Sequence, residues 1–313
     1  MPAPLRPGLL ASVLIFTVPT FGQQEPTPPT PTAASIMARV AANQDTSQAE
    51  RLRYVYLQHA RVISTKGGTI RCEEITDSRI TPAQKNSSQH LLSLSGRVLR
   101  KGKYVTYNHL PSTKSHGSSE TSDQRDDVEI NLDGPAEADR AIVESLRESL
   151  TNDDSRDGIA ADLFPLTSKS QGGEQFRLIG RETMNGRDTF HIAFSPKHKS
   201  DYGWKGDTWI DTAAFQPVVV RTTMARNVPF AVRTFLGTSL PGLGFTVTYA
   251  PEPGGVWFPT TFGTEFKIRV IFFFTRQVVM NAENSDFART HVSSRIVPDS
   301  ISGPLAQPEP QPN

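Results

Sequence analysis

Two stretches decide the fold of this chain: residues 178–197, LIGRETMNGRDTFHIAFSPK, and residues 204–220, WKGDTWIDTAAFQPVVV. In the first stretch, Asn185-Gly186 separates two runs, and the second run alternates apolar with other residues over Phe190–Phe194. Alternation with a period of two is typical of a strand with one buried face, and Asn-Gly is a turn pair of tight hairpins. The quoted residues therefore predict two antiparallel β-hairpins.

Strand patterns continue toward the C-terminal end. Several segments are rich in β-branched and aromatic residues that alternate with polar ones, which favours strands with one buried face. Phe287–Ile296 is a candidate for a last strand. The strands predicted in this half are Phe176–Thr183, Thr189–Ser195, Asp207–Asp211, Pro217–Arg226, Phe245–Tyr249, Trp257–Ile268 and Val270–Ala282.

The N-terminal half predicts two hairpins and two helices. Ala34 to Ala49 has apolar residues at helical spacing, and Ser35 can act as its N-cap. Asp133-Gly134-Pro135 introduces a second helix that runs to about Leu150. The hairpins expected are Arg53–Ile63 with Thr69–Ile80, turned at Lys66-Gly67-Gly68, and Leu91–Leu99 with Lys103–His109.

These elements together predict a mainly β fold with helices. Roughly ten strands with one apolar face must curl to cover that face. We therefore expect a highly curved antiparallel sheet, an unclosed β-barrel, that clasps the N-terminal helix and the second, inserted helix.

The ends of the chain differ in composition from its middle. Residues 1–22 are typical of an export signal, with Arg6 before the apolar run Gly8–Val18. This run is shorter than the roughly 20 apolar residues of a membrane span, although an uncleaved N-terminal anchor is the alternative. No Cys follows it, so we expect a periplasmic or otherwise exported protein without a lipid-modified N-terminus. The expected organisation is a signal peptide at 1–22, a Pro/Thr-rich linker at 23–33, a folded domain at 34–297 with a polar mobile loop at 111–133, and a disordered Pro-rich tail at 298–313.

The composition excludes several functional classes. The chain has 313 residues, of which 36% are hydrophobic, and this fraction is too high for wholesale disorder. It has 33 Lys and Arg against 32 Asp and Glu, a balance that provides no positive field for nucleic acid. A single cysteine, Cys72, can form no internal disulfide and no thiolate metal cage.

No motif for catalysis or metal binding is present in the sequence. The seven histidines lack the spacing that places two imidazoles on one metal, and there is no nucleophile elbow or phosphate-binding glycine loop. Glu73-Glu74 and Asp126-Asp127 are adjacent, and neighbouring side chains of a strand face opposite sides. We therefore expect no catalytic residue, no metal, no cofactor and no enzymatic activity.

The aromatic residues of the predicted strands allow two interpretations. They fill a solid core against the helices, or they line an apolar hollow that accepts an acyl chain. In the second interpretation Trp209 lies near the rim of the hollow. The ligand-binding candidates are Phe190, Phe194, Trp209, Phe245, Phe262 and Phe266.

A family resemblance appears at residues 178–220. Gly180, the turn Asn185-Gly186-Arg187, Trp209-Ile210-Asp211 and Gln216-Pro217-Val218 follow one another as in the central β repeat of the periplasmic lipoprotein-sorting carriers, a superfamily that is LolA/LolB-like and includes RseB-type domains. The chain resembles this superfamily over about half of the folded region. The resemblance implies an unclosed β-barrel, lidded by helices, whose apolar interior binds lipid moieties.

Three functions compete on this basis. The first is an exported protein that binds a lipid, an acyl chain or a lipoprotein on the apolar concave face of an open β-barrel, with peripheral membrane contact. The second is an envelope sensor or protein-interaction module with a filled core and no lipid ligand. The third is an enzyme centred on Cys72 or an acid pair. We favour the first function, with a lipid or lipid-modified protein as partner.

Overall fold

The computed structural model describes residues 31–83, 87–108, 134–150, 164–198, 203–226, 243–252, 254–270 and 274–290. The chain divides into the units Met1–Pro31 and Thr32–Asn313, and the fold described below is that of the second unit. The predicted signal peptide at 1–22, the loop at 111–133 and the tail at 298–313 lie outside the described residues, as does most of the linker at 23–33.

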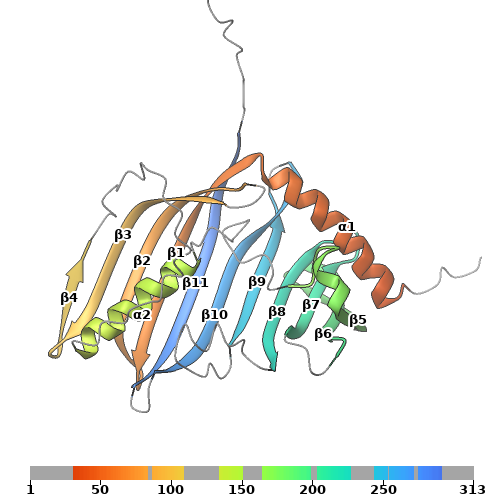
Figure 1. Ribbon diagram of the computed structural model, residues 1–313. Coiled ribbons are helices and arrows are strands. Elements are labelled where there is room, and N and C mark those ends of the chain that lie inside the picture. Colours follow the sequence, from red (N-terminus) through yellow and green to blue (C-terminus); the bar gives the residue numbers. More distant parts are fainter. Residues whose placement is uncertain are drawn as a thin grey trace, which may run out of the picture. The chain divides into compact units, whose positions relative to one another are not determined.

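The described strands form one antiparallel sheet of eleven strands (Figure 1). Its order is β4-β3-β2-β1-β11-β10-β9-β8-β7-β6-β5, so that most neighbours in the sheet are also neighbours in the chain. The bounds are β1 Tyr54–Lys66, β2 Thr69–Thr81, β3 Ser88–Arg100, β4 Lys103–Tyr107, β5 Glu174–Met184, β6 Arg187–Pro196, β7 Gly203–Asp211, β8 Pro217–Arg226, β9 Gly244–Pro251, β10 Trp257–Val270 and β11 Phe274–Arg289.

The sheet is joined in its middle and open at its edges. β1 pairs with β11 along nearly its whole length, from Tyr54↔Arg289 to Thr65↔Gln277. The edge strands β4 and β5 stand at opposite ends of the order and do not pair with each other. The fold class predicted from the sequence, a curved and unclosed antiparallel sheet with two helices, is confirmed.

The hairpins form where the turn residues predict them. Asn185 and Gly186 have φ angles of 49° and 75° between β5 and β6, as the primed turns of two-residue hairpins require. The predicted hairpins β1–β2 and β3–β4 are also present.

Helix α1 (Ala33–Arg51) starts one residue earlier than predicted, because Thr32 and not Ser35 is its N-cap. The Thr32 side chain accepts a hydrogen bond of 3.2 Å from the backbone N–H of Ser35. Helix α2 (Pro135–Leu150) and the short 3₁₀ helix η2 (Ser170–Gly173) complete the described helices.

Both α-helices contribute to the same core as the strands. Ile36, Met37 and Val40 of α1 and Ile142 and Val143 of α2 are buried in one hydrophobic cluster together with residues of the sheet. We call the face of the sheet that packs against α2 the concave face and the opposite face the outer face. A second, smaller cluster lies at the C-terminal end of α1 and consists of Tyr54, Tyr56, Ile80 and Phe258.

Two strand predictions are wrong in detail. The apolar run Val270–Phe274 is not the start of a strand: Val270 ends β10 and pairs with Phe274, the first residue of β11. The run therefore spans a hairpin connection, whose residues 271–273 lie outside the described ranges. Phe287 belongs to β11 and not to a separate last strand. Apolar content alone does not distinguish a strand from the connection between two strands, because cross-strand pairing sets the register.

Candidate functional site

Five phenylalanines predicted to bind a ligand lie on the concave face. Phe190 and Phe194 lie four positions apart on β6, and Phe262 and Phe266 lie four positions apart on β10. Side chains an even number of positions apart on a strand point to the same side, so each pair shares a face. Phe245 of β9 connects them, because a cross-strand row runs from Phe194 through Gly206 and Thr222 to Phe245 and on to Thr264. The topology therefore brings together five rings that are far apart in sequence.

The same face reaches α2. The row continues from Thr264 through Met280 of β11 and Val62 of β1 to Glu74 of β2, whose carboxylate faces Arg147 of α2. The apolar concave face thus continues into β1 and β2, where charged side chains such as Glu74 join apolar ones such as Val62 beneath α2.

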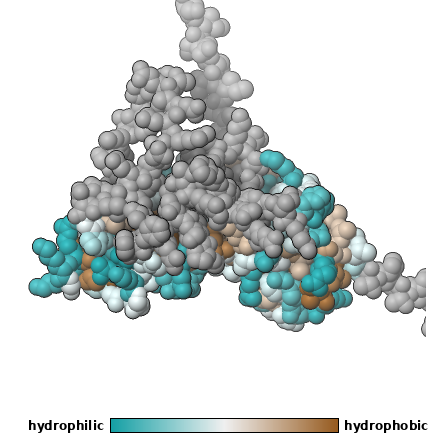
Figure 2. Space-filling view, turned by 60° about the horizontal axis from the view of Figure 1, so that its bottom comes forward, coloured by the Kyte–Doolittle hydropathy of each residue, from teal (hydrophilic) through white to brown (hydrophobic). Residues whose placement is uncertain are grey.

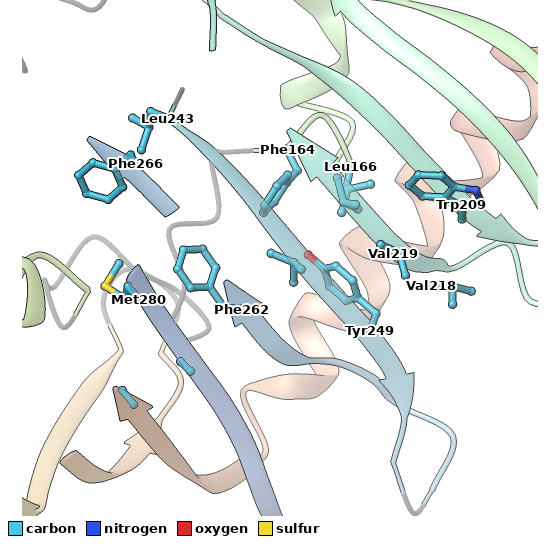
Figure 3. Packing of buried hydrophobic residues seen from close by; sticks show 14 of the residues in the cluster. Phe164, Leu166, Trp209, Val218, Val219, Leu243, Tyr249, Phe262, Phe266 and Met280 are labelled. Carbon is cyan, nitrogen blue, oxygen red and sulfur yellow. The ribbon is translucent and has the colours of Figure 1, made fainter. Parts of the chain in front are cut away.

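The five rings are covered to different degrees. Phe190, Phe194, Phe262 and Phe266 are 3–6% exposed, whereas Phe245 is half-buried. The Phe245 and Phe262 ring centroids are 5.3 Å apart, and Trp204 meets Phe245 edge-on at 5.1 Å. Figure 3 shows Phe262 and Phe266 close to Met280 and Leu243. Trp204, Phe245 and Phe262 therefore form a continuous aromatic surface.

Trp209, the sixth candidate, lies on the other face of the sheet. It pairs across the strands with His191, which alternates with Phe190 and Ile192. The Trp209 and His191 rings stack with centroids 4.7 Å apart, and the Arg221 guanidinium lies 5.0 Å from the Trp209 ring centroid. Figure 3 shows Trp209 well apart from Phe262 and Phe266. Trp209 belongs to the same large buried cluster as Phe190, Phe194, Phe262 and Phe266, but its side chain lies on the opposite face of the strands and is apart from the face that they share.

A buried ion cluster, which the sequence analysis missed, lies between α2 and the concave face. Asp139 of α2 has a side chain that is 0% exposed and forms an ion pair with Arg276 of β11, which is 3% exposed. Arg71 of β2 lies 3.3 Å from the same carboxylate, and Ser64 of β1 donates a hydrogen bond of 3.2 Å to it. Buried charges persist only when they are paired and hydrogen-bonded, so this cluster ties α2 to three strands.

Glu74, Tyr107 and Cys72 form a second polar group beneath α2. The Tyr107 hydroxyl donates a hydrogen bond of 2.7 Å to Glu74 Oε1, and its oxygen lies 3.5 Å from Cys72 Sγ. Burial raises the pKa of the Glu74 carboxyl and raises the pKa of the Cys72 thiol to about 12. Cys72 is therefore a neutral, enclosed thiol and lacks the thiolate that a catalytic cysteine needs.

On the outer face, a histidine of β1, an aspartate of β2 and a serine of β3 form a hydrogen-bonded group. His59 Nδ1 lies 2.7 Å from Asp77 Oδ1, and Ser93 Oγ donates to Asp77 Oδ2 at 2.6 Å. In a catalytic triad the serine must contact the histidine, whereas here both contact the aspartate. This arrangement activates no nucleophile.

Two cavities accompany the sheet. One of about 510 Å³ involves β5 to β8 and is lined by Phe176, Phe194 and Gly206 together with polar residues such as Arg177 and Lys205. The other, of about 470 Å³, involves β1, β9, β10 and β11. Its lining residues include His59, Arg61, Thr246, Phe262, Gly263 and Glu283. Most lining residues of the two cavities, such as Asp207 and Thr223 in the first and Arg61 and Asn281 in the second, occupy strand positions that alternate with the five phenylalanines and therefore belong to the outer face.

The surface of the described residues is mainly polar. Figure 2 shows teal over most of the coloured atoms on the side that it presents, with smaller brown areas. The large apolar side chains that are exposed among the described residues are Leu92, Tyr104, Val105 and Ile179. Within the same residues no cluster of three His, Cys, Asp or Glu side chains could hold a metal ion, and no helix is long and apolar enough to cross a membrane.

No protein-family model and no curated protein sequence matches the chain. Among solved structures it is similar to a DUF1329 family protein from Desulfovibrio piger, with 11% identity and a TM-score of 0.37 over 85% of this chain and 96% of that one. A LolA superfamily protein from Nitrosomonas europaea matches with 12% identity and a TM-score of 0.33, over 84% and 96% of the two chains.

A domain of the outer membrane lipoprotein-sorting type from Vibrio parahaemolyticus matches with 13% identity and a TM-score of 0.35, over 82% of this chain and 95% of that one. At these identities the similarity concerns the fold.

Proposed function

We propose that this chain is an exported protein that binds a lipid, an acyl chain or a lipid-modified protein on its concave face, and that it acts by binding and not by catalysis. The observation that carries the proposal is the set Phe190, Phe194, Phe245, Phe262 and Phe266 on one face of the sheet. A row of aromatic rings offers an acyl chain a large apolar area, and burial of about 25 cal/mol per Å² of apolar surface drives such binding.

The half-buried ring of Phe245 supports this site in particular. Phe245 lies between Trp204 and Phe262, with ring centroids 5.1 and 5.3 Å away. An apolar surface that is incompletely covered favours an apolar ligand, because covering it removes the remaining area from water.

The test is native mass spectrometry of the exported chain purified without detergent. We expect a mass increment of a lipid, which extraction with organic solvent removes and identifies. A protein that carries no lipid and takes up none from vesicles of phosphatidylglycerol and phosphatidylethanolamine would contradict the proposal.

A matched pair of variants separates binding from folding. Phe245→Ala removes a half-buried ring of the concave face, and Phe287→Ala removes a half-buried ring that packs on Tyr56 and Phe258 in the smaller cluster. Both variants should lose similar stability, whereas only Phe245→Ala should lower lipid uptake. Equal uptake by the two variants would argue against the concave face as the site.

The second candidate function is an envelope sensor or interaction module with a filled core. The burial of Phe262 and Phe266, which are 3% and 6% exposed, favours it. In that case Phe262→Ala and Phe266→Ala would each cost about 3–5 kcal/mol of stability, as cavities in a solid core do, without a separate binding defect.

A further inference from the structure

Thr222 carries a buried hydroxyl that has no hydrogen-bond partner. It lies on β8 in the row of the concave face between Gly206 and Phe245, and it is 3% exposed. Its Oγ1 is one of the buried side-chain atoms without a partner among the described residues. Buried hydroxyls are nearly always hydrogen-bonded, so an unbonded one in an apolar surrounding calls for a physical reason.

Two other threonines on the same face show that burial alone does not leave the hydroxyl unpaired. Thr208 of β7 donates to the carbonyl oxygen of Val219 at 3.3 Å, and Thr264 of β10 donates to that of Gly244 at 2.6 Å. These two residues are 1% and 5% exposed, so all three threonines are equally buried. Thr222 alone of the three has a free donor.

The cross-strand neighbours of Thr222, Gly206 and Phe245, offer its hydroxyl no polar side chain as a partner. Gly206 carries no side chain, and a Cβ there would come within 1.9 Å of the Arg221 carbonyl oxygen, so the strand pairing admits only glycine. The row therefore presents a ring at Phe194, no side chain at Gly206, a hydroxyl at Thr222 and a ring at Phe245.

We infer that the Thr222 hydroxyl donates a hydrogen bond to the carbonyl oxygen of an acyl ester bound on the concave face. The inference rests on the proposed function and names its ligand class: ester-linked acyl lipids, in preference to ether lipids and plain hydrocarbons. An ester has apolar methylenes for the flanking rings and, at the head of the chain, an uncharged acceptor for the hydroxyl. A hydrocarbon has no acceptor, and a free carboxylate would bring an unpaired charge into an apolar site.

The experiment compares two lipids that differ only in this acceptor. Dioleoyl phosphatidylglycerol and its ether-linked analogue are titrated into the full, exported chain, and bound lipid is measured by native mass spectrometry. The wild-type protein should bind the ester about three- to tenfold more tightly, the worth of one hydrogen bond. Thr222→Val should lower the ester affinity to that of the ether lipid, and Thr222→Ser should restore the preference.

Thr208→Val is the matched control. It removes a hydroxyl that is already bonded to the protein, so it should lower the midpoint of thermal unfolding and leave the ester preference unchanged. Thr222→Val removes an unbonded hydroxyl and should unfold at the wild-type midpoint or above it.

The outcomes separate the two proposals. If the wild-type protein binds neither lipid, the proposed function is overturned. If it binds both lipids equally, or if Thr222→Val keeps the ester preference, the ester inference is overturned while the lipid site stands. A crystal structure of the lipid-loaded protein with only a water molecule on Thr222 Oγ1 would also overturn the inference.

Discussion

Glu73 and Glu74 are neighbours on β2, but their carboxyls lie in opposite environments. Glu74 lies on the concave face beneath α2, whereas Glu73 lies on the outer face between Arg61 and Arg97, with Nε–Oε distances of 2.7 and 2.6 Å. Burial raises the pKa of Glu74. Burial also acts to raise the pKa of Glu73, but hydrogen bonds from Arg61 and Arg97 outweigh it and hold that pKa below its usual value.

The two shifts predict opposite pH effects on stability. Because the folded pKa of Glu74 is raised, its contribution to stability is complete below the usual value of 4.5 and is lost as the pH rises. Glu74→Gln should therefore unfold at the same urea concentration as wild type, or at a higher one, at pH 7. The difference should vanish near pH 4.

Glu73→Gln is the matched control for this prediction. The folded pKa of Glu73 is lowered, so its stabilising effect is present above 4.5 and is lost as the pH falls through the folded value. Its replacement should cost on the order of 1 kcal/mol at pH 7, because both arginines are partly exposed, and less at pH 4. Urea titrations at pH 7, 5.5 and 4 measure both variants; parallel changes in the two would contradict the opposite placement of the carboxyls.

Cys72 should be chemically inert while the protein is folded. A pKa of about 12 instead of 9.0 lowers the thiolate fraction at pH 8 about a thousandfold. Maleimide labelling at pH 8 should therefore be slow in buffer and fast in urea. The raised pKa also means that the stability contributed by the neutral thiol is lost between about pH 9 and 12. Rapid labelling of the native protein would show that the site beneath α2 is open.

At the scale of elements, Asp139 ties α2 to the sheet. Its carboxylate contacts Ser64, Arg71 and Arg276 on three different strands. Apolar residues of the same helix, such as Ile142 and Val143, stabilise its packing on the sheet, but apolar contacts are not directional and do not fix the orientation of the helix. The ion cluster, together with the pairs Arg147–Glu74 and Glu137–Arg100, therefore fixes the position of the helix on the concave face.

Removing one partner of this cluster should be costly. Asp139→Asn leaves Arg276 buried without a full counter-charge, and we expect a loss of about 3–5 kcal/mol in urea unfolding. Glu144→Gln on the same helix removes only a partly exposed i,i+4 pair with Arg140 and should cost about 0.5 kcal/mol or less. A small loss for Asp139→Asn would mean that apolar contacts alone hold the helix.

At the scale of the whole described fold, the pairing of β1 with β11 joins two halves of the sheet. One side consists of β1 to β4, close together in sequence, and the other of β5 to β11. Buried residues such as Val62 and Met280 pack across this junction. The junction is the long-range contact that makes one sheet out of two meanders (Figure 1).

A chain that lacks β11 should therefore fail to fold as a unit. Deletion of residues 274–313 exposes the concave side of β1 and β10, and we expect loss of the cooperative unfolding transition and of resistance to protease. Deletion of residues 298–313 alone, the tail expected from the sequence to be disordered, keeps β11 and should leave the urea midpoint unchanged. A cooperative unfolding transition in the chain without residues 274–313 would show that β1–β4 and β5–β10 fold independently of β11.

Local patterns predicted much of this architecture. Alternation through Phe190–Phe194 and the Asn185-Gly186 turn predicted the hairpins, and the Pro135 start predicted α2, because strand faces, turns and helix starts depend on residues a few positions apart. The same local reasoning erred at Val270–Phe274, where an apolar run crosses a hairpin connection whose position depends on pairing. The resemblance at residues 178–220 led to the correct fold class.

The amino-acid sequence by itself determined most of the strands, the two α-helices and the buried face of strands such as β6 and β10, since these follow from periodicity. Only the tertiary structure decided that Trp209 lies apart from the five phenylalanines, that Asp139 meets Arg276, and that the hydroxyl of Thr222 is unpaired whereas those of Thr208 and Thr264 are bonded. Each of these facts depends on the register between strands or on the position of a helix against the sheet. Register and helix position are set by contacts between residues distant in the chain, which no local pattern contains.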